Sequence, residues 1–135
     1  MPGTTPYEYP VQALESDTDA LQHVNNLVYL RWVQEAAAAH WAVLSNGDLN
    51  QPYRWVVLRH EIDYRAPAFA GEQLLVSTWV ASAAGARSDR HTAIINRVSG
   101  QLLAAAVTTW CLVDAITLRP RRIDAALAAI LGIVP

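Results

Sequence analysis

The chain has 135 residues, of which 53% are hydrophobic and 16% are charged, and its net charge is -2. This length suits a single domain over residues 1–135, and the weakly acidic balance excludes a typical nucleic-acid-binding protein, which would be basic. All ten basic residues are arginine, so no lysine is present for Schiff-base chemistry, and the lone Cys111 excludes an internal disulfide and a cysteine-rich zinc site.

The apolar composition also predicts self-association and a location. A hydrophobic share of 53% is high for a small monomer, so we expect surface that is buried between subunits. The first ten residues, MPGTTPYEYP, lack the basic and apolar regions of a secretory signal peptide. No apolar run reaches the length of about 18 residues that a membrane span needs. We therefore expect a cytoplasmic protein that does not bind membranes.

The first half of the chain predicts a short strand followed by one long helix. Residues 9–14 have strand character. Beyond the next loop, apolar side chains recur at helical spacing as far as Leu44, and Asn46 and Gly47 supply a typical helix end. The alanines at 36–39 favour a helix and would let it lie close against a sheet.

The second half predicts four more strands and a short final helix. The hydrophobic period changes to two, which would place Leu58 on one face together with His60 and Ile62. The expected strands are residues 54–64, 74–80, 88–98 and 102–114, and the expected helix is 123–131. The order β-α-β-β-β-β predicts an α+β fold in which a curved antiparallel sheet wraps around one helix.

Polar groups suited to catalysis gather in the loop before the long helix. Asp17 and Asp19 are followed by His23 and then by Asn25 and Asn26. These side chains would lie at the positive end of a helix dipole, where backbone N–H groups lack partners within the helix. Such a place can stabilise a developing oxyanion. Asp and Asn are also the preferred caps of helices, so a purely structural role is the alternative.

These residues resemble a known family. The sequence DTDALQHVNN at residues 17–26, with YLRW at 29–32 and EA at 35–36, resembles the hotdog-fold acyl-CoA thioesterases, in the branch that contains 4-hydroxybenzoyl-CoA thioesterase and the acyl-ACP thioesterases. Similar later segments are IDYRAP at 62–67, AGEQL at 70–74, residues 100–114 and LRPRRI at 118–123. The resemblance covers nearly the whole chain.

The resemblance implies a fold, an assembly and a substrate. The fold would be a hotdog, with a central helix inside an antiparallel sheet. Two subunits would join their sheets side by side, with active sites at the interface, and dimers often pair into tetramers. The substrate would be a thioester whose acyl group enters a buried slot. Its hydrolysis needs no metal or redox cofactor, and four scattered histidines indicate no metal site.

By its position in the motif, Asp19 is similar to the family's catalytic carboxylate. It would attack the thioester and form an anhydride, or it would take a proton from the attacking water. His23 would polarise the carbonyl, orient the water or shuttle a proton, with a loop histidine that hydrogen-bonds the backbone as the structural alternative. The backbone N–H groups from Val24 to Asn26 would bind the oxyanion. Gln22 or Asn25 would supply a catalytic amide, and Asp17 is assigned a structural role.

The chain departs from the family's pattern at two positions. Leu21 stands where acyl-ACP thioesterases carry Asn, and Gln22 stands where many relatives carry Gly. A second candidate for the base is Glu35, because another hotdog branch places a catalytic Glu on the central helix. Arg31, one turn earlier, offers Glu35 an ordinary salt bridge instead.

Substrate contacts are expected from the same region and from arginines. Tyr29 would line the acyl slot or donate its hydroxyl, with core packing as the ordinary alternative. Arg87 and Arg90 are interpreted as flanking a turn, where they would meet the phosphates of coenzyme A. The full set of expected substrate-binding residues is Gln22, Val24, Asn26, Tyr29, Arg87 and Arg90. Other arginines are candidates for the same contact, and each one is alternatively a solvated surface charge.

The leading hypothesis is hydrolysis of an acyl-CoA to a carboxylate and free coenzyme A. One alternative is hydrolysis of acyl-carrier-protein thioesters. The other is a non-catalytic hotdog protein that binds an acyl thioester.

Overall fold

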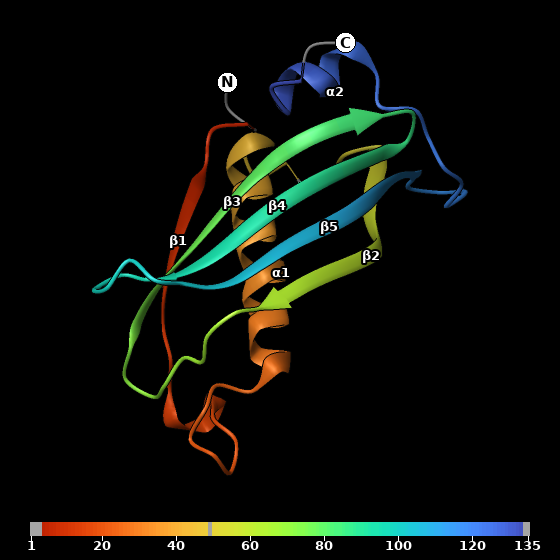
Figure 1. Ribbon diagram of the computed structural model, residues 1–135. Coiled ribbons are helices and arrows are strands. Elements are labelled where there is room, and N and C mark those ends of the chain that lie inside the picture. The colour runs from red at the N-terminus through yellow and green to blue at the C-terminus, as the bar shows by residue number, and fades with distance from the viewer. Residues whose placement is uncertain (1–3, 49, 134–135) are drawn as a thin grey trace.

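A computed structural model describes residues 4–48 and 50–133, in which a five-stranded antiparallel sheet lies across one long helix (Figure 1). The elements in chain order are β1 (Tyr7–Gln12), the 3₁₀ helix η1 (Glu15–Asp17), α1 (Asn26–Leu44), β2 (Tyr53–Tyr64), β3 (Gln73–Ala84), β4 (Arg87–Asn96), β5 (Leu102–Asp114) and α2 (Ala125–Ile130). This order confirms the predicted α+β architecture. No described helix is both long and apolar enough to cross a membrane.

The strands lie in the order β1-β3-β4-β5-β2, so β1 and β2 form the two edges of the sheet. Figure 1 shows β3, β4 and β5 crossing α1 obliquely, with the helix covering one face of the sheet. Along α1 the core residues include Val33 and Ala36, which are 1% and 0% exposed and pack with Leu74 and Ile94 of the sheet. The small side chain of Ala36 permits this close approach.

Strand β2 contains a bulge, which makes one expectation wrong. The pairing with β5 shifts register between Val57, which faces Trp110, and Arg59, which faces Thr109. Leu58 is therefore an extra residue, and an extra residue reverses the alternation of side chains beyond it. Leu58 is 49% exposed and does not share a face with His60, which is partly buried.

The turn between β3 and β4 is tighter than expected. β3 continues to Ala84, and β4 begins at Arg87, so only Gly85 and Ala86 form the turn. Gly85 has a φ of 61°, a left-handed conformation that glycine adopts without steric cost. At the other end of the chain, α2 begins at Ala125 because Asp124 caps it by accepting the Leu127 N–H at 2.8 Å.

Candidate active site

Asp17 fixes the acidic loop to the long helix. This residue is 6% exposed, and its carboxylate accepts the Leu14 N–H at 2.9 Å and the Arg31 guanidinium at 3.0 Å. Its backbone carbonyl also accepts the Asn25 N–H at 2.9 Å. These contacts give Asp17 the structural role expected of it. Arg31 lies much closer to Asp17 than to Glu35, which is 3.9 Å away and exposed.

The carboxylate of Asp19 is oriented by its own loop. Oδ1 accepts the N–H of Leu21 at 2.9 Å and that of His23 at 3.3 Å. The Asp19 N–H donates to the His23 carbonyl at 2.8 Å, which closes the loop around the side chain. Within residues 4–48 and 50–133, no hydrogen bond reaches Oδ2. One oxygen is thus held in place, and the other is left for a water molecule or a substrate.

The turn around Asp19 places Gln22 in a strained conformation. Its φ is 67°, in the left-handed region, where a residue with a side chain is destabilised by about 1–2 kcal/mol. Glycine would adopt this conformation without steric cost. The Gln22 side chain is exposed, so no packing against the core offsets the strain of this turn.

A cavity of about 260 Å³ lies beside this loop and is called the Asp19 cavity here. It is formed by the acidic loop, the start of α1, the end of β2 and the turn after it. The lining residues are Asp19, His23, Val24, Asn26, Tyr29, Tyr64, Arg65, Ala66 and Pro67. The structure therefore brings together most of the loop and helix residues chosen from the sequence, while Gln22 and Asn25 lie outside the lining.

The start of α1 leaves one backbone donor unused. The Val24 N–H donates to the Ala68 carbonyl at 2.9 Å, and the Asn25 N–H is taken by the loop as described above. The Asn25 side chain caps the helix by accepting the Leu27 N–H at 3.0 Å. The Asn26 N–H has no hydrogen-bond partner in the described part of the chain. Of the expected oxyanion donors, only Asn26 is therefore free.

Tyr29 and His23 form part of the wall of the Asp19 cavity, and each is held by a contact outside it. The Tyr29 hydroxyl oxygen accepts the Ala68 N–H at 3.0 Å, so its own proton remains available for donation. Burial raises the pKa of Tyr29 above its usual value, which keeps the hydroxyl protonated at neutral pH. The ring of His23 packs edge-on against Phe69, with the ring centres 5.2 Å apart.

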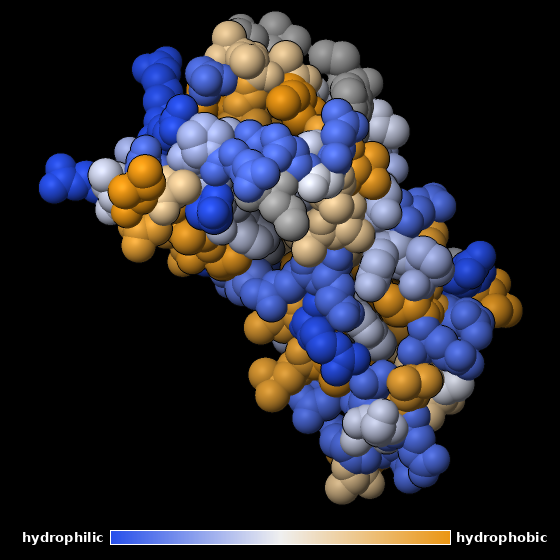
Figure 2. All heavy atoms as spheres, turned by 180° about the vertical axis from the view of Figure 1, so that it is seen from behind, coloured by the Kyte–Doolittle hydropathy of each residue, from blue (hydrophilic) through white to orange (hydrophobic). Residues whose placement is uncertain are grey.

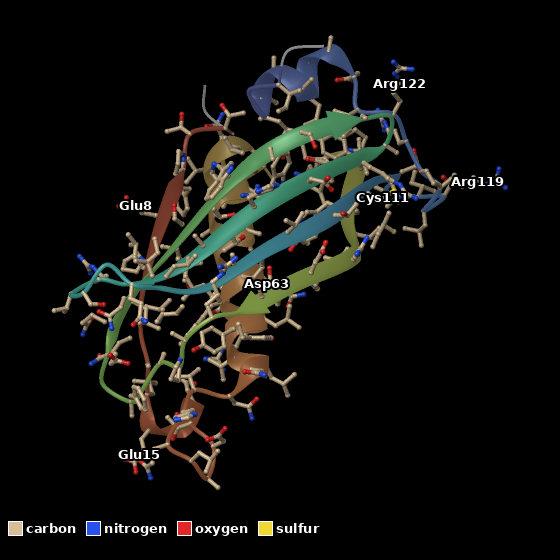
Figure 3. All side chains as sticks on the ribbon, viewed as in Figure 1. Glu8, Glu15, Asp63, Cys111, Arg119 and Arg122 are labelled. Atoms are coloured by element: carbon tan, nitrogen blue, oxygen red, sulfur yellow. The ribbon has the colours of Figure 1, made fainter. Side chains whose placement is uncertain are left out.

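The arginines are distributed differently from the sequence interpretation. Arg65 lines the Asp19 cavity, although it was only one of several arginine candidates in the sequence. Arg87 is exposed at the start of β4. The interpretation that Arg90 flanks a turn is wrong, because it lies inside β4 and is 5% exposed. Figure 3 shows Arg119 and Arg122 at the end of the molecule opposite to Glu15, far from the acidic loop.

Sequence reasoning could have found Arg65 from its position alone, since it directly follows β2 in the IDYRAP segment. Its neighbours Tyr64 and Pro67 become visible as site residues only when the end of β2 is folded against α1. Groups of three or more His, Cys, Asp or Glu side chains that could hold a metal ion do not occur among the described residues.

The sequence is similar to a known family and to a curated relative. The profile of the thioesterase-like superfamily matches residues 14–131 of the chain. The long-chain acyl-CoA thioesterase FadM of Escherichia coli (strain K12) is 30% identical over 104 residues, which cover 71% of this chain and 74% of that protein.

Solved structures share the fold over most of their length. A probable thioesterase from Escherichia coli superposes with a TM-score of 0.81 at 26% identity, covering 92% of this chain and 95% of that one. A 1,4-dihydroxy-2-naphthoyl-CoA thioesterase from Synechocystis gives a TM-score of 0.82 at 23% identity, covering 94% and 96%. These likenesses confirm the fold predicted from the sequence.

Proposed function

The chain belongs to the thioesterase-like superfamily, and we propose that it hydrolyses an acyl-CoA thioester to a carboxylate and free coenzyme A. The observation that carries the proposal is a cavity lined by both Asp19, which has an unused carboxylate oxygen, and Asn26, which has an unused N–H. Acyl transfer needs a base or nucleophile and a donor for the oxyanion. The relative named as a long-chain acyl-CoA thioesterase favours coenzyme A as the carrier.

In this proposal, the thioester carbonyl oxygen accepts the Asn26 N–H. As general base, Asp19 takes a proton from water while the water oxygen attacks the carbonyl carbon. The tetrahedral oxyanion then collapses, the C–S bond breaks, and the thiolate of coenzyme A takes up the proton. As nucleophile, Asp19 itself displaces the thiolate and forms an anhydride, which water hydrolyses. Both routes use the same two groups.

The fold favours this chemistry through electrostatics. Asn26 is the first residue of α1, so its N–H carries the partial positive charge of the helix N-terminus. The donor is fixed before the reaction begins, because Asn25 caps the helix and Asp17 anchors the loop. A donor that does not have to reorient stabilises a developing negative charge most effectively.

The remaining residues of the site have supporting roles in the proposal. His23 polarises the carbonyl or moves a proton, and Tyr29 donates its hydroxyl proton toward the substrate. Val24 contributes to the wall of the cavity. Asn25 caps the helix through Oδ1, and a catalytic role for its amide stays a prediction. Arg65 is the cation best placed for the carrier, and contact of Arg87 with the nucleotide stays a prediction.

We propose that the protein acts as a homodimer or homotetramer, with sites at the subunit interface. On the side of the molecule opposite to Figure 1, apolar atoms form several patches between hydrophilic ones (Figure 2). The exposed apolar side chains include Val56 and Leu58 on the edge strand β2, which are 40% and 49% exposed. Apolar surface at an edge strand is suited to burial against a second subunit.

A cytoplasmic location also stays a prediction.

The proposal is tested by measuring release of free thiol from a panel of acyl-CoA thioesters with different acyl groups. The test compares the unmodified protein with Asp19→Asn and with Asp63→Asn, which removes an exposed carboxylate at the end of β2. We expect Asp19→Asn to lower kcat by about 10²–10⁴-fold and Asp63→Asn to leave it unchanged. Asn keeps the oxygen that accepts the loop amides, so the fold is retained.

The outcomes separate the proposals. Cleavage of acyl-carrier-protein thioesters alone would favour the alternative carrier, and binding of acyl-CoA without cleavage would favour the non-catalytic alternative. Full activity of Asp19→Asn would refute the assignment of the site but not of the function. In a single turnover in heavy-oxygen water, label in the Asp19 side chain shows that the anhydride formed, because the general-base route brings no water oxygen into that carboxylate.

A further inference from the structure

A second cavity, of about 370 Å³, lies at the other end of α1 and is called the Arg90 cavity here. Its walls include Trp41 of α1, Trp55 of β2, and Arg90 and Trp110 of the central strands. It shares no lining residue with the Asp19 cavity. From Asn26 in one lining to Ala38 in the other, α1 rises by about 18 Å. The two cavities are therefore separate sites along one helix.

The Arg90 cavity contains a buried cation without a carboxylate partner. Nη1 of Arg90 donates to Nδ1 of His40 at 2.7 Å and to Oγ1 of Thr78 at 3.2 Å. Arginine has only donors, so this Nδ1 must be unprotonated. Both partner atoms are thus uncharged acceptors. Among residues 4–48 and 50–133, no carboxylate lies within ion-pair distance of Arg90.

The guanidinium of Arg90 also has unused donors. In the same ranges, Nε and Nη2 have no protein acceptor. Burial lowers the pKa of Arg90 to about 10, which leaves it charged at neutral pH. Buried charges in proteins are normally paired, because an isolated charge in an apolar environment is costly. Arg90 therefore lacks, among the described residues, the anionic partner that a buried charge normally has.

The walls of the Arg90 cavity are rich in donors and poor in free acceptors. The indole N–H groups of Trp55 and Trp110 are buried, and neither has an acceptor in the described part of the chain. The acidic side chain in the lining is Asp48, which is exposed. Its oxygens already accept the Asn50 N–H and the Gln51 amide. Buried donors without acceptors are rare in folded proteins and call for an explanation.

We propose that the Arg90 cavity binds an apolar monocarboxylate, with its carboxylate paired to Arg90 and its apolar body against Trp41, Trp55 and Trp110. A carboxylate has only acceptors and fits the forked donors of a guanidinium. One buried cation matches one negative charge, whereas a phosphate dianion would bring an uncompensated second charge. At about 30 Å³ per water-sized group, the cavity holds a ligand of roughly a dozen heavy atoms.

Isothermal titration calorimetry with 4-phenylbutanoate and its uncharged analogue 4-phenylbutanamide tests this proposal. The proteins are the unmodified chain, Arg90→Met, and Arg97→Met, which removes an exposed arginine just beyond β4 and changes the net charge equally. We expect the unmodified chain and Arg97→Met to bind the acid at least ten-fold more tightly than the amide. Arg90→Met should lose this preference and still bind the amide.

Equal affinities of the unmodified chain for acid and amide would overturn the proposal. A preference for the acid that survives in Arg90→Met would also overturn it. If Arg90→Met does not fold, as judged by circular dichroism, the acid and amide titrations of the unmodified chain still decide the question. None of these titrations depends on hydrolytic activity, so their failure is distinct from a failure of the proposed thioesterase function.

The carboxylate has two possible sources, a free acid or the far end of an acyl group. Hydrolysis of palmitoyl-CoA is therefore compared with that of the coenzyme A monothioester of hexadecanedioic acid, which carries a carboxylate at the same chain length and is long enough to reach from one cavity to the other. This comparison alone rests on the proposed function. If Arg90→Met lowers kcat/KM at least ten-fold for the hexadecanedioic thioester and not for palmitoyl-CoA, the far end of the acyl group is the ligand. An equal response of both thioesters identifies a free acid.

Discussion

The two ends of α1 lie beside side chains of opposite charge and opposite exposure. At the start of the helix, Asp19 is exposed, and the N–H groups of Leu21 and His23 orient one of its oxygens. Near the other end, Arg90 is 5% exposed and contacts the uncharged groups of His40 and Thr78. Each charge has the sign that the helix dipole favours at its end. The polarity of one helix thus suits an acidic site at one end and a basic site at the other.

The difference lies in access to water, and it indicates what each end is suited to. An exposed carboxylate with a free oxygen can meet water and react, as the proposed hydrolysis requires. A buried guanidinium cannot rearrange its surroundings at low cost, so it selects a ligand by charge instead. The open end is therefore suited to chemistry, and the closed end to recognition.

The strongest test of the open end removes a single backbone donor. Asn26→Pro deletes the N–H at the first helical position, where proline is well tolerated. The preceding residue, Asn25, already has the extended backbone that proline requires, with φ -62° and ψ 138°. We expect kcat to fall by about 10²–10³-fold, as when one oxyanion donor is lost. Steady-state kinetics with the best thioester substrate measure the effect.

Asn26→Ala is the matched control for this substitution, because it shortens the same side chain and keeps the N–H. Its kcat should stay close to that of the unmodified chain. Equal kcat values for the proline and alanine variants would remove Asn26 from the proposed oxyanion site.

A second test asks how firmly the open end is held. Asp17→Ala deletes a buried carboxylate that accepts from Leu14 and Arg31, and we expect the free energy of unfolding to fall by about 2–3 kcal/mol. Glu15→Ala, which removes an exposed carboxylate of the same 3₁₀ helix, should change it by less than about 0.5 kcal/mol. Urea unfolding measures both. Similar losses in the two variants would show that Asp17 does not anchor the loop.

A third substitution relieves strain at the open end. Gln22→Gly places glycine at a φ of 67°, and we expect the free energy of unfolding to rise by about 1 kcal/mol. The gain stays below the full strain energy because glycine also makes the unfolded chain more flexible. Urea unfolding measures the gain, and Gln12→Gly in β1 is the control that should lower stability. A loss of stability in Gln22→Gly would contradict the strained turn.

The smallest expected effect concerns pH and a residue between the two ends. His60 of β2 contacts Thr108 at 2.9 Å, and its other ring nitrogen is buried without a partner among the described residues. Burial lowers its pKa below the usual 6.5, so the unfolded state binds the proton more strongly. The contribution to stability is complete above pH 6.5 and is lost as the pH falls below that value toward the folded pKa.

His60→Asn removes this titration and keeps a polar partner for Thr108. Urea unfolding between pH 5 and about 7.5 should therefore show a flatter decline on acidification than in the unmodified chain. His91→Asn, in β4, is the control for loss of a histidine in another strand. Parallel pH profiles of His60→Asn and the unmodified chain would contradict the assignment.

Most of the fold could be predicted from the sequence, because the hydrophobic periods of its helix and strands are strong and local. The helix that ends at Leu44 and the strand from Leu102 to Asp114 appear as expected. In β4 the hydrophobic alternation of the sequence is weak, because the buried positions include Ser88, Arg90 and Thr92. Polar side chains can face a core when partners come from other elements, as His40 and Thr78 do for Arg90. Those partners are distant in sequence, so periodicity could not reveal them.

The candidate site was predictable to the extent that it is local. Asp19, His23 and Asn26 lie within eight residues and belong to one loop and one helix start. The Val24 N–H donates to the carbonyl of Ala68, which lies more than 40 residues away in the sequence. The sequence therefore indicated the acid and the imidazole, and only the folded chain shows which backbone donor is free.

The bulge at Leu58 decides which side chains of β2 share a face. Trp55 and Tyr64 line different cavities but are nine positions apart, an odd number that would send them to opposite faces of a regular strand. The extra residue turns the odd spacing into an even one, so a single strand can serve both ends of α1. Loss of that one codon would leave the reading frame intact and still turn one of the two aromatic side chains away from its cavity.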